Sequence, residues 1–168
     1  MGRQMQDRWP ASALLRIPPP LVYVAAFLLG VGLQRLVPVP LSPAVHGSTV
    51  RTAGAALLAF GILLGPINAL MFLVRGTTLN PADAPRRLFT GGLYRLTRNP
   101  MYIGLLLVYT GVAALSAQPW ALVLIAIPFV AVDRVYIPCE ERRMAAAFGA
   151  EYLAYCRRVR RWLGVRRG

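Results

Sequence analysis

Residues 99–133 read NPMYIGLLLVYTGVAALSAQPWALVLIAIPFVAVD and carry no charged side chain before Asp133. A membrane-spanning helix needs about 20 apolar residues, within a range of about 17–25. Two such segments, 101–117 and 120–137, start within this stretch, and the turn between them (116–119) also lacks charge. The sequence therefore predicts two spanning helices joined by a short uncharged turn.

Two further apolar stretches precede this pair, at 21–37 and 50–74. The chain is 57% hydrophobic and only 15% charged, whereas a soluble domain has roughly 25% charged residues. We therefore predict an all-α fold, a polytopic membrane helical bundle with about four transmembrane helices and a C-terminal amphipathic helix in the cytoplasm. We expect one integral membrane domain over residues 1–168, with leading spans in 1–75 and a functional core in 76–168.

The arginines predict how this bundle is oriented. All 19 basic residues are arginine, the formal net charge is +13, and the arginines collect in 1–19, 75–98 and 134–168. By the positive-inside rule these blocks face the cytoplasm, which places both termini there. Arginine-only basicity in an Ala-, Gly- and Pro-rich chain is typical of a GC-rich bacterial genome. We therefore expect a protein of the bacterial inner membrane.

The same distribution bears on the partners. A nucleic-acid-binding face needs arginines spread over a folded polar surface, so we expect no nucleic acid. We expect no metal either, because His46 is the single histidine and the spacing of Cys139 and Cys156 fits no zinc or redox motif.

One polar cluster lies at the start of the third span, where residues 91–104 read GGLYRLTRNPMYIG. Asn99 is a preferred N-cap residue and Pro100 suits the first helical position, so the pair predicts a helix start. Arg98 and Tyr102 lie four residues apart, and Gly104 leaves room beside Tyr102. The cluster is thus compatible with a helix start and interfacial tyrosine alone, or with a binding site.

A second polar cluster follows the fourth span, where residues 133–143 read DRVYIPCEERR. Pro138 predicts a new helix with Glu140 and Glu141 in its first turn, where the helix dipole favours carboxylates. The competing interpretation is a site for a zwitterionic or cationic ligand, because acidic residues at the end of a span are expensive and often functional.

The tail predicts a basic amphipathic helix. Phe148, Tyr152 and Tyr155 recur at spacings of four and three, which places them on one helix face, and arginines fall outside that face. Such a helix is expected to lie on anionic membrane lipids.

In order, the motifs Gly-x-Tyr-Arg, Arg-Asn-Pro-Met-Tyr-x-Gly, Glu-Glu, Phe-Gly-x-Glu-Tyr-x-x-Tyr and Val-x-Arg-Trp-Leu resemble the isoprenylcysteine carboxyl methyltransferase family. The phospholipid methyltransferases share the same core. The resemblance covers 76–163 and makes 76–168 a methyltransferase-like core. It implies an integral membrane enzyme that transfers a methyl group from S-adenosylmethionine to a lipid or isoprenoid-like substrate, which reaches a cytosolic site from the bilayer.

The resemblance also implies the site residues. Glu140 and Arg134 are the expected catalytic residues. The expected cofactor-binding residues are Arg98, Asn99, Pro100, Tyr102, Gly104, Glu140, Glu141, Tyr152 and Arg158. An arginine suits the carboxylate of the cofactor, and tyrosine faces and a glutamate suit its sulfonium. Asn99 stands where many members have histidine, which leaves it a hydrogen-bonding role.

Two other functions stay open at this point. Membrane sterol-type reductases use a similar helical scaffold and a similar Arg-x-Pro-x-Tyr motif, so the tail arginines are compatible with NADPH. A non-catalytic protein whose tail binds anionic lipid is the third candidate. The Glu-Glu and Phe-Gly-x-Glu-Tyr order favours the methyltransferase. The methyl acceptor stays open among a phospholipid amine, an isoprenoid carboxylate and a thiol.

Overall fold

The computed structural model describes residues 13–41, 47–74 and 88–165, and within these ranges its regular elements are helical. One isolated bridge joins Val159 to Val165. The elements are η1 (Ala13–Arg16), α1 (Pro19–Leu36), α2 (Ser48–Val74), η3 (Gly92–Arg95), α3 (Pro100–Leu115), α4 (Pro119–Leu124), α5 (Ala126–Ala131), the π-helical turn η4 (Val132–Tyr136) and α6 (Ile137–Arg158). The all-α prediction is confirmed.

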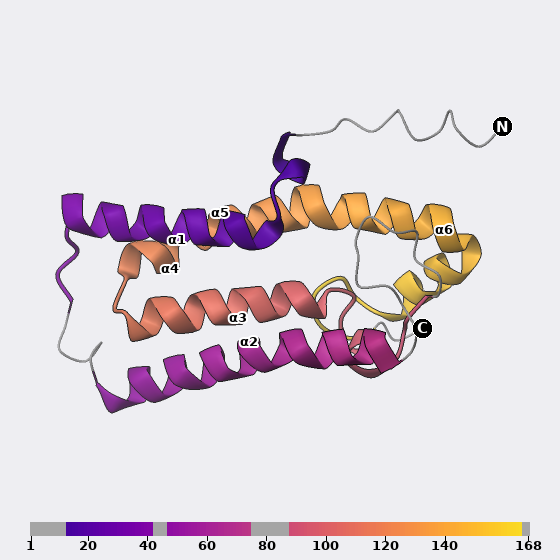
Figure 1. The fold of residues 1–168 in the computed structure, drawn as a ribbon, viewed down its shortest axis with the longest axis horizontal. Helices are drawn as coiled ribbons and strands as arrows, with labels where there is room; N and C mark the ends of the chain where they lie inside the picture. Colours follow the sequence, from indigo (N-terminus) through magenta and orange to yellow (C-terminus); the bar gives the residue numbers. More distant parts are fainter. Residues whose placement is uncertain (1–12, 42–46, 75–87, 166–168) are drawn as a thin grey trace.

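The helices run nearly parallel to the long axis of the molecule, with α3 between α2 on one side and α1 and α4 on the other (Figure 1). α6 and the segment before α3 lie at one end of this axis. The beginning of α2 and the turn between α3 and α4 lie at the opposite end (Figure 1). The two polar clusters of the sequence therefore meet at one end of the bundle.

The contact between α2 and α3 is made by glycines spaced seven apart on each helix. Gly54 and Gly61 on α2 face Gly111 and Gly104 on α3, respectively. A Cβ at Gly111 would lie 2.6 Å from the backbone nitrogen of Leu58 and 2.7 Å from the carbonyl oxygen of Gly54. Small residues are the usual means of close helix approach in membranes. Gly104, expected to leave room beside Tyr102, leaves room for α2.

On the other side of α3, aromatic residues join it to α1. The ring of Tyr109 makes edge contacts with Tyr23 and Phe27, at centroid distances of 6.1 and 5.7 Å. Its hydroxyl donates to the carbonyl of Ala121 at 2.9 Å, which ties α3 to α4 as well. Gly30 of α1 packs directly on the backbone of Ala121.

Apolar helix surfaces are exposed over much of the molecule. α1 exposes Leu21, Val24, Leu28 and Leu29, α2 exposes Phe60, Ile62 and Leu63, and α4 and α5 expose Val123, Ile127 and Val130. Soluble monomers rarely leave so much contiguous apolar surface in water. Two helical stretches, Pro19–Leu36 and Pro119–Arg158, are long and apolar enough to cross a bilayer, and Ser48–Leu64 and Pro100–Leu115 are shorter apolar helices. The number of spans stays a prediction.

The fourth apolar helix does not end near residue 137 as expected. It pauses at Ile125, because Pro128 has no N–H to donate to the carbonyl of Leu124, and then continues through the η4 turn into α6. α6 begins at Ile137 with Pro138 and Glu140 in its first turn, as predicted, but it follows the π-helical turn without a break, since Tyr136 and Ile137 are both in the α-helical region.

The C-terminal helix is the part of α6 that follows Gly149. This glycine has φ 51° and ψ −124°, a conformation that side chains disfavour, and the chain reverses there (Figure 1). The reversal packs Tyr152 and Tyr155 against Tyr94 and Leu88, so both tyrosines are buried in protein. The face that was expected to lie on lipid is an internal contact, whereas Arg157 and Arg158 are exposed.

Several predicted features lie outside the described residues. They are the arginines of the first basic block up to residue 8, the loop containing His46, the arginines at 75–87 and those at 166–167.

The glycine contact between α2 and α3 predicts the effect of adding one methyl group. Gly111→Ala forces backbone atoms apart, and we expect it to lower the free energy of unfolding by about 1–3 kcal/mol. A denaturant titration of the purified protein in detergent, followed by circular dichroism, measures this loss.

Gly32→Ala is the matched control, because a Cβ at Gly32 of α1 meets no atom within 4 Å. We expect unchanged or slightly higher stability, since alanine costs less backbone entropy than glycine in a helix. Equal stability of the two variants would show that the two helices do not rely on this close contact.

Candidate functional site

The site begins where two distant segments pair: residues 96–99, just before α3, and residues 160–164, after α6. The backbone nitrogen of Arg98 donates to the carbonyl of Arg160 at 3.1 Å, and that of Gly164 donates to the carbonyl of Leu96 at 2.8 Å. Gly164 has φ 106°, which lets the tail turn beside this pairing. The start of α3 is thereby attached to the end of the described chain.

Two polar side chains strengthen the attachment. Thr97 Oγ1 and Asn99 Nδ2 both donate to the carbonyl oxygen of Arg161, at 3.2 and 2.9 Å. α3 begins at Pro100 as predicted, but the Asn99 side chain makes no capping hydrogen bond. Its amide donates to the tail instead, at the carbonyl oxygen of Arg161.

Four charged residues meet beside this pairing. The Glu141 carboxylate binds Arg161 through two bonds, Nη2 to Oε2 at 2.7 Å and Nε to Oε1 at 3.1 Å, and binds Arg98 Nη2 at 3.0 Å. Arg161 Nη1 also donates to Asp133 Oδ1 at 3.2 Å. Hydrogen bonds from Arg161 to Glu141 raise the pKa of this guanidinium further above its ordinary value, so it stays charged. The cluster is two cations bound to two anions.

The π-helical turn η4 brings the two carboxylates to the same side of their helix. Asp133 and Glu141 are eight residues apart, which in a regular helix of 3.6 residues per turn would rotate them away from each other. A turn with i→i+5 hydrogen bonds takes up one extra residue, so the pair is spaced like two residues seven apart, close to two full turns. Both can therefore reach Arg161.

Tyr102 and Glu140 form a second pair next to this cluster. The buried Tyr102 hydroxyl of α3 donates to Glu140 Oε1 of α6 at 2.6 Å. The Glu140 side chain is otherwise exposed. The two predicted motifs are thus joined side chain to side chain, with an accessible carboxylate at the junction.

Arg98 is enclosed by these groups. Its side chain is 11% exposed, Nη2 binds Glu141, and Nη1 contacts the Cys156 thiol. Nε is buried and has no hydrogen-bond partner among the described residues. A buried cationic N–H without an acceptor costs free energy, and an acceptor that reached this atom would relieve that cost.

Of the other predicted residues, Pro100 is buried at the start of α3, and Tyr152 is buried with its ring 6.1 Å from that of Tyr155. Two further predicted residues are exposed, and one of them pairs with a member of the cluster. Arg134 is 80% exposed and pairs with its neighbour Asp133 at 3.3 Å, and Arg158 is exposed on the last turn of α6.

The sequence reasoning missed Arg161 and Trp162 as site residues. Trp162 donates from its indole Nε1 to Asp133 Oδ1 at 3.0 Å and stacks on Phe129 at a centroid distance of 5.0 Å. The signal was present, because Arg161 and Trp162 are the last polar pair of the recognised motif Val-x-Arg-Trp-Leu. However, residues 157–161 contain four arginines, and the sequence alone gave no reason to prefer Arg161 among them.

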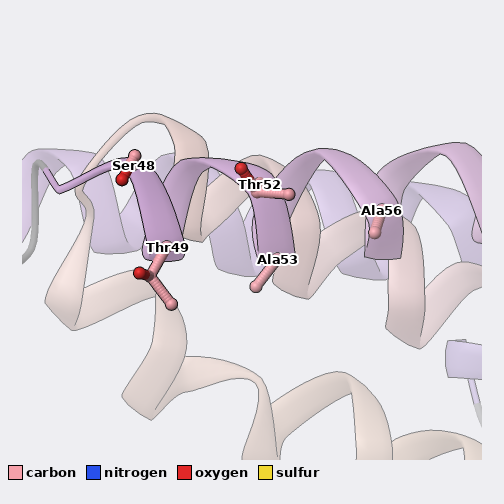
Figure 2. Close-up of a pocket in the computed structure, with 5 residues that line it drawn as sticks. All are labelled: Ser48, Thr49, Thr52, Ala53 and Ala56. Atoms are coloured by element: carbon pink, nitrogen blue, oxygen red, sulfur yellow. The ribbon is translucent and has the colours of Figure 1, made fainter.

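Two surface hollows lie along α2. Figure 2 shows one over the first turns of α2, lined by Ser48, Thr49, Thr52, Ala53 and Ala56. This region is at the end of the bundle opposite the polar cluster (Figure 1) and offers hydroxyl groups only. Among the described residues, no three His, Cys, Asp or Glu side chains gather as a metal site would require.

A comparison with known families gives one match. A sequence model described as phospholipid methyltransferase matches residues 49–151, more than half of the chain. The matched range holds α2 through the first part of α6, including Arg98, Tyr102, Glu140 and Glu141, and stops before Arg161. No curated protein and no solved structure matches the chain.

Proposed function

The chain belongs to the phospholipid methyltransferase family, and from that premise we propose that it transfers methyl groups from S-adenosylmethionine to a membrane-embedded or amphiphilic substrate. The family and the apolar helices make it a membrane protein of a lipid-methylating family. The observation that carries the finer proposal is the buried, unpartnered Nε of Arg98 beside the Glu140 and Glu141 carboxylates.

The residues of this site fit the donor chemically. S-adenosylmethionine carries a carboxylate, an ammonium and a sulfonium, and when bound it supplies an electrophilic methyl group. The Arg98 Nε is a donor of the kind that carboxylates prefer. Glu140 offers an accessible anion, and Tyr102 and Tyr152 are the aromatic groups that stabilise cations. The set contains a complement for each charge of the donor.

Glu140 has a second role in this proposal. One of its oxygens accepts the Tyr102 hydroxyl hydrogen bond, which holds the carboxylate in place, and the side chain is otherwise exposed. It takes a proton from an attacking amine or thiol. A carboxylate nucleophile carries no proton to remove, and Glu140 then only orients the reactants. In either case the chain contributes mainly by holding the reacting groups in line.

The surroundings of the site support a lipid acceptor at the cytoplasmic face. Arg95 is exposed at the end of η3, just before the segment 96–99, and Arg157 and Arg158 are exposed on the last turn of α6, just before the tail 160–164. Exposed arginines beside apolar helices favour anionic lipids and the cytoplasmic side of the bacterial inner membrane. We propose this orientation, with both termini in the cytoplasm.

Ligand binding tests the donor. Isothermal titration of the purified protein in detergent should give heat with S-adenosylmethionine and with S-adenosylhomocysteine, and none with NADPH. Heat with NADPH alone would replace the proposal by the reductase. No heat with either sulfur ligand would contradict the donor assignment.

Methyl transfer tests Glu140. We expect Glu140→Gln to lower the transfer of labelled methyl groups to extracted bacterial lipids by about a hundredfold for an amine or thiol acceptor, because general bases contribute about 10²–10⁴. Glu151→Gln is the matched control: it changes the same charge on an exposed position of the same helix. If both variants transfer methyl groups at the parental rate, Glu140 does not act in the reaction.

Protease accessibility tests the orientation. An epitope fused after Gly168 should be cleaved in inverted inner-membrane vesicles and protected in spheroplasts. The reverse pattern would place the polar cluster outside the cytoplasm.

A further inference from the structure

Arg161 lies ten residues beyond the range that the family model matches, yet its side chain contacts both carboxylates of the cluster. We propose that Arg161 is a positioning residue of the methyl-donor site: it fixes Glu141, and Glu141 fixes Arg98. The inference rests on the proposed function and adds to it the part of the chain that completes the site.

The first step is the geometry of the Arg161 guanidinium. Its Nε and Nη2 bind the two oxygens of Glu141 side by side, and its Nη1 binds Asp133 at both the carboxylate and the backbone carbonyl, at 3.2 and 3.3 Å. The planar, rigid fork of arginine matches this arrangement, and the ammonium of lysine does not. Glu141 therefore has one orientation while Arg161 is in place.

The second step leads from Glu141 to Arg98. Oε1 of Glu141 accepts from Arg98 Nη2 at 3.0 Å as well as from Arg161. With Nη2 on Glu141 and Nη1 on the Cys156 thiol, the guanidinium plane of Arg98 is fixed and its unpartnered Nε has a fixed direction. Without Arg161, Glu141 is free to turn, and the direction of that N–H is lost.

The third step separates this role from a merely structural one. The tail is attached through the backbone of Arg160, Arg161 and Gly164, which accepts from or donates to residues 96–99. Trp162 holds Asp133 and stacks on Phe129 through its own side chain. These attachments do not involve the Arg161 side chain, so we expect a variant at this position to keep the fold.

Calorimetry with S-adenosylhomocysteine tests the inference. We expect Arg161→Gln to raise the dissociation constant at least about tenfold (about 1.4 kcal/mol), because the direction of the Arg98 Nε–H is lost with the Glu141 contacts. Arg161→Lys should lie between this variant and the parent chain. Arg160→Gln, a neighbouring exposed position with the same charge change, should bind like the parent.

A double-mutant cycle gives the readout that a structural role would not produce. If Arg161 acts through Glu141, the variant Arg161→Gln/Glu141→Gln should bind no more weakly than Glu141→Gln alone. The unfolding midpoint of each ligand-free variant shows whether the fold is kept.

Three outcomes would overturn the inference. Parental affinity of Arg161→Gln, with weakened binding by Arg98→Gln, leaves the donor site standing without Arg161. Additive losses in the cycle mean that Arg161 acts independently of Glu141. Absence of binding by the parent chain removes the proposed function itself, and with it this inference.

Discussion

The Glu141 carboxylate, bound by Arg98 from one side and Arg161 from the other, is the interaction on which the polar end of the molecule depends. It joins three parts of the chain: the segment before α3, the helix α6 and the tail after it. Removing charges from water is costly, and an ion pair returns that cost only when further hydrogen bonds satisfy its remaining atoms. Here Asp133, Trp162 and the paired backbones provide them. One donor, Arg98 Nε, has no acceptor within the part of the chain that the structure describes.

The apolar part of the bundle solves a different problem. In a bilayer, apolar side chains gain little free energy by contacting each other instead of lipid tails, so helices associate through close packing. The glycines of α2 and α3 permit that packing. On the other side of α3, the Tyr109 hydroxyl donates a hydrogen bond to the carbonyl of Ala121 in α4. The rigid helices in turn bring residues 98–102 next to 133–141, because α3 begins at the end of the bundle toward which the fourth apolar helix runs (Figure 1).

Much of the architecture follows from composition, because a bilayer demands long uncharged stretches and the chain places its arginines outside them. The expected segments 21–37 and 101–117 match α1 and α3 within two residues. The motif pair Arg98–Tyr102 and Glu140–Glu141 is also brought together as its order suggested. Local periodicity does not reveal the π-helical turn or the reversal at Gly149, since each is a single-residue departure from a regular helical repeat. For the same reason Arg161 could not be distinguished from its neighbouring arginines: its partners lie 20 and 28 residues earlier, on a face that only the π-helical turn creates.

The reliance of Arg98 on a tail more than sixty residues later has a consequence for biosynthesis. A membrane protein is synthesised and inserted from its N-terminus, so the apolar helices leave the ribosome before Arg160 and Arg161 do. The bundle can therefore enter the bilayer while the polar end is still incomplete. A chain that stopped after α5 would contain α1 to α5 but would lack Glu141. Nothing would then orient the Arg98 side chain. Orientation of Arg98 thus requires that the chain has been synthesised through Arg161.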